Sequence, residues 1–335
     1  MLFVLVHSGF SYPPPSWLFL QQVAPPGTGQ GERVKVCWDI LGLGIAAVDD
    51  LLYVDGYPQP DTKVAVQARQ CQGGGLTATA LVAASRLGAQ AAYGGVLGDD
   101  DLSRFTLREL AREGVDCTPV LRTADAGPCY SLVLVDRVTG SRTILYDKAR
   151  VRSRRPDQVT AELIGRCRLL FVDYTTGHGG LQAARVAHDL GIEVVGDVER
   201  LDVPAAEALL HEIDHLIVGI ELAAQVTAEH DPERMVRVLS GTKRACCVVT
   251  GGDRGCWYAE HDTEVRHMPA HPVQVVDTTG CGDVFHGAYA ACISHGEDIS
   301  TAIEVASAAA AIKATQPGGR AGIPDRATVD RFLQR

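Results

Sequence analysis

The sequence predicts an α/β protein built on a doubly wound, mostly parallel sheet, with a small β-sheet lid. From Val36 onward, short apolar runs of strand length alternate with longer segments of helical periodicity. Several runs, such as Leu169 to Val172, are apolar on both faces, as a strand covered by helices on both sides requires. The runs mostly follow one another at about 20 to 30 residues, which leaves room for a crossover helix.

The predicted elements alternate along the chain. The strands expected in the sheet are Val36 to Leu43, Gln90 to Gly94, Arg168 to Asp173, Ile192 to Asp197, His215 to Val218 and Ala245 to Thr250. The helices expected between or after them are Thr77 to Leu87, Asp101 to Glu113, His178 to Leu190 and the Ala-rich Thr301 to Ala314. Gly114 and Gly191 follow two of these helices, where C-terminal caps belong.

Two stretches break this pattern. Leu51 to Arg69 is interrupted by glycine and proline, and Cys129 to Tyr146 alternates around a turn at Thr139-Gly140. Both are predicted as antiparallel strands, and neither has enough apolar residues to form a core alone. We expect these lid segments, at about 51–70 and 129–147, to meet as a small sheet over the mouth of a main domain that spans residues 36–335.

Composition limits the partners of the chain. A net charge of -10 would repel a phosphate backbone, so nucleic acid is not expected as a partner. No apolar run approaches the roughly 20 residues of a membrane-spanning helix, which predicts a soluble protein without a membrane partner. Ten irregularly spaced cysteines without a Cys-x-x-Cys pair favour a reducing cytoplasm.

Residues 1–35 lack the basic start and the cleavage site of a secretory signal, and are predicted to be a disordered extension.

The most informative segment is Asp277-Thr278-Thr279-Gly280-Cys281-Gly282-Asp283, which precedes a predicted helix from Val284 to Ser294. Small residues at the start of a helix let backbone N–H groups converge, and the helix dipole favours negative charge there, so the pattern predicts an anion hole. Asp283 could reach an incoming hydroxyl while the N–H groups hold a phosphoryl group. The simpler interpretation is an ordinary tight turn in which Asp283 stabilises the helix N-terminus.

This segment resembles the second signature of the PfkB, or ribokinase-like, carbohydrate kinases, which usually reads Asp-Thr-x-Gly-Ala-Gly-Asp, and the resemblance covers nearly all of Trp38 to Arg335. It implies an ATP-dependent sugar kinase with Asp283 as the catalytic base and an anion hole at Gly280, Cys281 and Gly282. Asp277, with Thr279, is implied near a monovalent cation site or the sugar. Cys281 stands at the usual alanine position, and size explains it better than a reactive thiol.

Two further segments resemble the nucleotide side of the family. Thr250 to Gly255 resembles the nucleotide-binding loop, which implies contacts from Thr250, Gly252 and Gly255, although a plain hairpin would look similar. Ala314 to Gly322, including Gly318, resembles a loop that covers the adenine and lends carbonyls to a potassium site in some members; a flexible helix exit is the alternative. The implied cofactors are ATP, Mg²⁺ and, in such members, K⁺. The family's Asn-x-x-Glu is missing around Glu221, so the Mg²⁺ ligand stays open.

The sugar side rests on two similar stretches. Gly44 to Asp49 resembles the family's opening, whose aspartate binds substrate hydroxyls. Gly73 to Thr79 resembles the first signature, in which Gly74 and Gly75 make a turn into a helix lining the sugar pocket; Thr79 stands where many members have asparagine.

Lys63 and Arg142 stand in the two lid segments. Arg142 could hold a sulfonate or phosphate by two hydrogen bonds, while simple solvation of both charges is the alternative. Within the family the sequence is most similar to sulfofructose kinases, although the polar lid residue expected near Ala124 is not evident. The substrate stays open among ketohexoses, their 6-phosphates or 6-sulfonates, ribose and nucleosides.

The sequence also allows functions other than a kinase. Gly42-x-Gly44-x-x-Ala47 could belong to a dinucleotide-binding oxidoreductase, but Asp49 to Pro60 does not look like the helix that this motif demands. A non-catalytic sugar or nucleotide sensor on the same fold is the stronger alternative. No zinc motif is present, and His286 is expected to be packed. Unpaired sheet edges allow a homodimer through the lid, with a monomer as the alternative.

Overall fold

All the strands predicted for the main sheet are present in the computed structural model, which describes residues 35–139, 141–241, 244–261 and 263–334. In spatial order the sheet contains β14 (Arg266–Met268), β13 (Cys256–Glu260), β12 (Cys246–Thr250), β11 (His215–Gly219), β10 (Glu193–Asp197), β9 (Cys167–Asp173), β1 (Trp38–Leu43) and β4 (Ala91–Tyr93). The predicted strands, β12 to β4 in this order, run parallel. The two strands that were not predicted, β13 and β14, add antiparallel at one edge. The extension predicted for residues 1–35 lies, apart from Lys35, outside the described residues.

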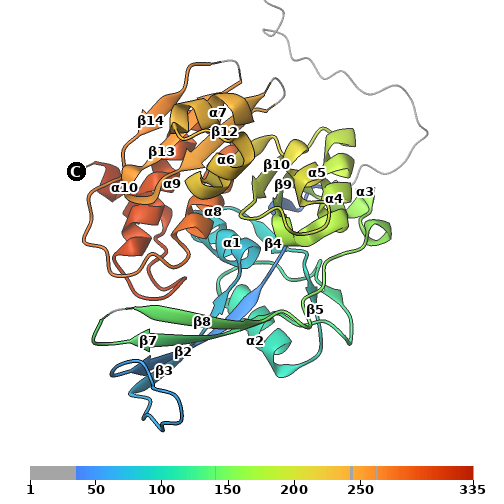
Figure 1. The fold of residues 1–335 in the computed structure, drawn as a ribbon. Coiled ribbons are helices and arrows are strands. Elements are labelled where there is room, and N and C mark those ends of the chain that lie inside the picture. The colour runs from blue at the N-terminus through green and yellow to red at the C-terminus, as the bar shows by residue number, and fades with distance from the viewer. Residues whose placement is uncertain (1–34, 140, 242–243, 262, 335) are drawn as a thin grey trace, which may run out of the picture. The chain divides into compact units, whose positions relative to one another are not determined.

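Helices cover both faces of this sheet (Figure 1), as the doubly wound prediction requires. One face carries α1 (Leu76–Arg86), α8 (Cys281–Ser294), α9 (Ile299–Ala314) and α10 (Arg326–Leu333). The other face carries α3 (Ala161–Ile164), α4 (Gly177–Asp189), α5 (Ala206–His211), α6 (Ile220–Thr227) and α7 (Pro232–Ser240). Within β9, Leu169 and Phe171 pack toward the first group and Leu170 and Val172 toward the second, because side chains alternate across a strand.

The predicted helices are confirmed, with one shift that matters for the site. The left-handed φ angles of Gly114 and Gly191, 80° and 70°, confirm both predicted caps. The helix predicted from Val284 is α8, which begins three residues earlier at Cys281. Asp283 is therefore inside the first helical turn.

A second sheet of four strands, which we call the lid sheet, contains in spatial order β3 (Ala68–Gly74), β2 (Ala47–Val54), β7 (Cys129–Asp136) and β8 (Arg142–Asp147). Figure 1 shows it as a separate layer beside the larger sheet. The β2/β3 and β7/β8 pairs are antiparallel as predicted, but β2 and β7 pair in parallel, which the prediction missed. The first lid strand also begins at Ala47 rather than Leu51, since only a short turn separates it from β1. Gly140 of the predicted turn lies outside the described residues.

The edge strand β8 is exposed along its whole length, including Ile144, Leu145 and Tyr146. A homodimer through this edge stays a prediction. All ten cysteines lie in the described residues, and all are free thiols. Within the described ranges, no helix has the length and apolar character needed to cross a bilayer.

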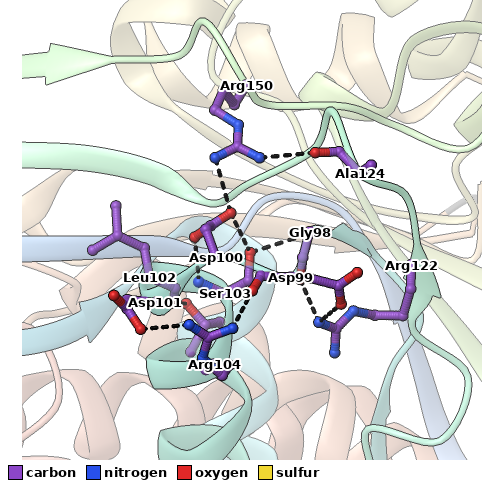
Figure 2. Close-up of polar contacts among 11 residues, drawn as sticks. Gly98, Asp99, Asp100, Asp101, Leu102, Ser103, Arg104, Arg122, Ala124 and Arg150 are labelled. Carbon is purple, nitrogen blue, oxygen red and sulfur yellow. Dashed lines mark hydrogen bonds and ion pairs between the residues drawn. The ribbon is translucent and has the colours of Figure 1, made fainter.

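The chain that leaves β8 is anchored at the start of α2 (Asp101–Arg112), as Figure 2 shows. Asp100 caps this helix by accepting from the Ser103 N–H at 2.9 Å, and its carboxylate lies 3.1 Å from the Arg150 guanidinium. Arg150 also donates to the Ala124 carbonyl at 3.0 Å. Burial alone would raise the pKa of Asp100, but the Ser103 hydrogen bonds and Arg150 hold that pKa below its ordinary value.

Replacing Asp100 by alanine is therefore expected to lower the free energy of unfolding by about 1 to 2 kcal/mol, since the cap and the Arg150 pair are lost together. Urea unfolding at neutral pH measures this, and the difference should shrink below about pH 4, where the wild-type carboxylate takes up its proton. The neighbouring Asp99→Ala is the matched control: the Asp99 side chain is 78% exposed, against 23% for Asp100, so its loss should cost no more than about 0.5 kcal/mol. Equal effects of the two variants would contradict the assignment.

Candidate active site

The parallel strands change winding direction at β1, which has β4 on one side and β9 on the other. Ligands of open α/β sheets bind beyond the carboxyl ends of the strands at such a switch point. Asp173, the fully buried last residue of β9, organises this point: it accepts from the Ile45 N–H and the Thr77 hydroxyl, both at 2.7 Å, and from the Thr175 N–H at 2.9 Å. Burial raises the pKa of Asp173. No role was predicted for Asp173, although an aspartate at the end of an apolar strand is a visible signal in the sequence.

The N-terminus of α8 supplies main-chain donors at the same edge. Gly280 has φ 75°, and a Cβ there would lie 2.7 Å from the Gly319 carbonyl oxygen, so only glycine fits. The Cys281 N–H donates to the Thr278 carbonyl at 3.2 Å. Among the described residues, the N–H groups of Gly280, Gly282 and Asp283 have no backbone acceptor, as expected at a helix start. Together they form a concentration of unused donors that suits an anion.

Asp283 lies among other carboxylates that follow the sheet strands. Burial raises the pKa of Asp283, and the nearby carboxylates of Asp197, at the end of β10, and Glu199 raise it further. The side chains of His286 and Arg320 act in the opposite direction. Burial likewise raises the pKa of Asp197. The site therefore combines clustered acids with two cationic or potentially cationic groups, the arrangement from which a base active near neutral pH is built.

His286 is buried as expected, one turn after Asp283, but its ring is not merely packed. Nδ1 lies 2.8 Å from the Gly282 carbonyl oxygen, and Nε2 lies 3.1 Å from that of Ile217 and 3.6 Å from the Asp197 carboxylate. Carbonyl oxygens only accept, and a neutral imidazole donates through one nitrogen. The neutral ring can therefore donate to only one of these two carbonyl oxygens.

Arg320, which lies in the predicted Ala314 to Gly322 loop and for which no role was predicted, is a buried cation of the site. Its side chain is 7% exposed, and it donates from Nε to the Thr79 hydroxyl at 3.1 Å and from Nη2 to the Gly74 carbonyl at 2.8 Å. Burial lowers the pKa of Arg320 to about 10, while the carboxylates of Asp283 and Asp49 oppose this fall. The guanidinium is still charged at neutral pH. It interacts both with Asp49, on the proposed sugar side, and with Asp283, in the first turn of α8.

The sugar-side residues surround this guanidinium. Asp49 lies within β2, opposite Ser131 of β7 and Gln72 of β3. Burial raises the pKa of Asp49, against a Ser131 hydrogen bond and the charge of Arg320. A Cβ at Gly74 would overlap the Asp49 carboxylate, so the glycine there makes room for it. Gly75 has φ 93° and precedes α1, as the predicted turn requires.

Thr79 is buried in α1, and its hydroxyl is engaged by Arg320. This contact gives a physical reason for a hydrogen-bond acceptor at this position: the hydroxyl accepts the Nε–H of Arg320. A direct contact of Thr79 with the sugar stays a prediction.

Arg142 and Lys63, the two cations predicted in the lid, have different surroundings in the structure. Arg142, at the start of β8, donates to the Asp277 carboxylate at 3.1 Å and thus reaches the segment before α8. Lys63 lies in the exposed loop between β2 and β3, and among the described residues nothing pairs with its ammonium. Asp49 of β2 and Tyr146 of β8 both pair with Ser131 of β7. Because Arg142 is four residues from Tyr146 along β8, Arg142 lies about 13 Å from the level of Asp49 along the strands. Arg142 therefore lies nearer to the segment that leads into the anion hole than to Asp49.

Asp277 and Thr279, the residues predicted near a monovalent cation, form one tight cluster with Gly318. The Asp277 carboxylate accepts from the Thr279 N–H at 2.8 Å and from the Gly318 N–H at 2.9 Å. Burial alone would raise the pKa of Asp277, but these bonds and the charge of Lys313 hold it below its ordinary value. Burial raises the pKa of the Cys281 thiol, which agrees with the interpretation that Cys281 is there for its size.

The loop predicted to bind nucleotide follows the carboxyl end of β12. Thr250 ends this strand, a single 3₁₀ turn spans Gly252–Arg254, and Gly255 has φ 80° where the chain reverses into β13. The hairpin that was the alternative interpretation is therefore present. Its loop lies at the carboxyl ends of the parallel strands, the edge at which β10 ends in Asp197. Contacts of Thr250, Gly252 and Gly255 with a nucleotide stay a prediction.

Known proteins of one kind match this chain. The family described as pfkB family carbohydrate kinase matches residues 39–326. The chain is 25% identical over 305 residues to the ribokinase of Haemophilus influenzae, covering 87% of this chain and 97% of that protein. It is 27% identical over 289 residues to fructokinase-1 of Zea mays, covering 78% and 88%. Its fold is similar to that of Arabidopsis thaliana ribokinase complexed with ribose and ATP, with a TM-score of 0.75, 20% identity, and coverage of 88% of this chain and 98% of that one.

Proposed function

This chain belongs to the pfkB family of carbohydrate kinases, and from that premise we propose that Asp283 is the base that takes the proton from the sugar hydroxyl as it attacks the γ-phosphate of ATP. The observation that carries the proposal is the position of Asp283 in the first turn of α8, beside the unused N–H groups of Gly280 and Gly282. A carboxylate and an anion-binding helix start thus lie next to each other. Phosphoryl transfer requires little more than positioning, charge neutralisation and an in-line nucleophile.

The anion hole of the proposal consists of the main chain at Gly280, Cys281 and Gly282, in which the N–H groups of Gly280 and Gly282 are unused and that of Cys281 donates to the Thr278 carbonyl. Their placement at a helix start favours the negative charge of a transferring phosphoryl group. A Cβ at Gly282 would meet no atom within 4 Å, so open space adjoins this turn. This supports an approach of substrate atoms to the Gly282 backbone. Arg142, held over the same segment by Asp277, is proposed to act on the phosphate side rather than on the sugar.

The sugar is proposed to lie between Asp49 and Asp283, with Gly74 and Gly75 closing the pocket and Arg320 between the two carboxylates. Asp49 accepts hydrogen bonds from sugar hydroxyls, and Asp283 faces the hydroxyl that is phosphorylated. The relatives named ribokinase and fructokinase support a pentose or ketohexose as substrate. A 6-phosphate or 6-sulfonate would need a cation at the far end of the pocket, and the exposed ammonium of Lys63 is the free candidate.

ATP is proposed to bind along the loop Thr250 to Gly255 and the Gly318 loop, with its phosphates toward α8. Mg²⁺ would bind together with the ATP phosphates and neutralise part of their negative charge. One or two carboxylates and water would complete its coordination. Glu199 after β10 and Glu221 in the first turn of α6 are two exposed carboxylates on this edge that could make such a contact.

ADP release tests the proposal. The purified full chain is given Mg-ATP and K⁺ with ribose, ketohexoses, their 6-phosphates, sulfofructose and nucleosides in turn. We expect turnover of one sugar class and none by Asp283→Asn. If no sugar is turned over while ATP or a sugar still binds in calorimetry, the base assignment fails and a sensor on the same fold becomes the better description.

A further inference from the structure

Lys313 is a lysine without exposed surface in the last turn of α9. Its side chain is 0% exposed, whereas lysine is almost never fully buried unless its charge is paired. The adjacent Ala314 and Ala309, one turn earlier, are also buried and offer no side-chain partner. An ammonium in such surroundings is expensive without a hydrogen-bonding partner, so what it contacts indicates its role.

The partner is the segment that leads into the anion hole. Lys313 Nζ donates to the Asp277 carbonyl oxygen at 2.8 Å. The N–H groups of Val276 and Asp277 donate in turn to the Ala314 carbonyl, at 2.8 and 3.1 Å. Lys313 therefore closes a junction between the C-terminus of α9 and the chain entering α8. A cation is also favoured at a helix C-terminus by the helix dipole.

The resemblance to the family implied a monovalent cation at this junction, held by Asp277, Thr279 and carbonyls of the loop after α9. In the structure the oxygens of Asp277 already accept N–H groups: Oδ1 from Thr279 and Arg142, Oδ2 from Gly318, and the carbonyl oxygen from Lys313. A K⁺ ion here would lie beside an ammonium and a guanidinium and would be repelled by both. These residues therefore do not fit a bound K⁺.

The charge of Lys313 also interacts with residues in the first turn of α8. Burial lowers the pKa of Lys313, while its interactions with Cys281, Asp277 and Asp283 act in the opposite direction. Asp283 and Cys281 belong to the first turn of α8. The ammonium is thus fixed on the segment that leads into the first turn of α8, and a fixed positive charge near that turn stabilises negative charge that develops there.

On the basis of the kinase function proposed above, we propose that the Lys313 ammonium is a built-in monovalent cation of this enzyme. It holds the Asp277 segment against α9 and supplies positive charge near the first turn of α8, so that phosphoryl transfer requires no K⁺.

Ion dependence and chemical rescue test this proposal. For the wild type, the phosphorylation rate and the melting temperature should be unchanged when K⁺ is replaced by tetramethylammonium. Lys313→Ala should lose about 100-fold in kcat without K⁺, and K⁺ or NH₄⁺ should restore part of that loss and raise its melting temperature, because a small cation can enter the space left. Lys313→Met fills that space with an uncharged chain, so it should be equally slow and should not respond to either ion.

Lys35→Ala, which removes an exposed lysine, is the control and should behave as the wild type. A wild type that slows tenfold or more without K⁺, or a folded Lys313→Ala that no small cation rescues, would overturn the proposal. The melting temperatures answer the question without turnover: if no sugar is phosphorylated at all, the kinase proposal fails, whereas a K⁺ response confined to Lys313→Ala still supports the built-in cation.

Discussion

Asp283→Asn should lower kcat by about 10³-fold while leaving the affinity for ATP within about threefold of the wild type. The asparagine keeps the shape of the side chain and the position of α8 but cannot take a proton. The N–H groups proposed to hold the phosphates belong to the main chain and are unaffected. Steady-state kinetics with the best sugar of the panel measures the first effect, and titration calorimetry with ATP measures the second.

The pH dependence adds a separate test of the same residue. Because burial and the neighbouring acids raise the pKa of Asp283, the wild-type kcat/KM should fall on its acidic side at a pH above the ordinary aspartate value of about 3.9. In Asp283→Asn this acidic limb should vanish from the residual activity. Cys281→Ala, two residues away, is the matched control and should keep both the rate and the limb. Retention of more than about a tenth of kcat by Asp283→Asn would exclude its role as the base.

The main sheet could be predicted because its strands are apolar on both faces, a pattern that few other structures require. β14 was missed because it is a three-residue edge strand with partly exposed residues, and β13 because the chain reverses into it directly after β12 with no crossover helix between them. The start of α8 was placed three residues late because glycine and cysteine at its first turn have weak helix propensity. Gly280 with its left-handed φ, not the apolar pattern, marks where this helix begins.

The candidate base could be predicted from a local segment, whereas its electrostatic partners could not. Arg320 meets Thr79 across 241 residues of chain, and Lys313 meets Asp277 across 36. No periodicity or spacing encodes such contacts. The one local sign for Lys313 was a charged residue at the end of an Ala-rich helix, where solvation was the simplest expectation. Only the packing of α9 against α8 makes that position fully buried.

Arg320→Met should move the acidic limb of kcat/KM to higher pH by about one unit or more. Arg320 is a cation whose charge lowers the pKa of Asp283, so its removal raises that pKa and leaves less of the base deprotonated at a given pH. Activity near neutral pH should therefore fall and should recover partly as the pH is raised. The KM for the sugar should rise as well, since the charge of Arg320 also lowers the pKa of Asp49.

Two milder variants separate this electrostatic effect from a loss of packing. Arg320→Lys keeps the charge but loses the fork that reaches Thr79 and Gly74, so the limb should move less than in Arg320→Met while KM still rises. Thr79→Val leaves Arg320 in place without one acceptor and should cause a smaller shift in the same direction. Arg331→Met removes an exposed arginine of α10 and should leave the profile unchanged. If Arg320→Met loses activity equally at every pH while the limb stays in place, Arg320 only supports the fold, and the basicity of Asp283 must be set by its other neighbours.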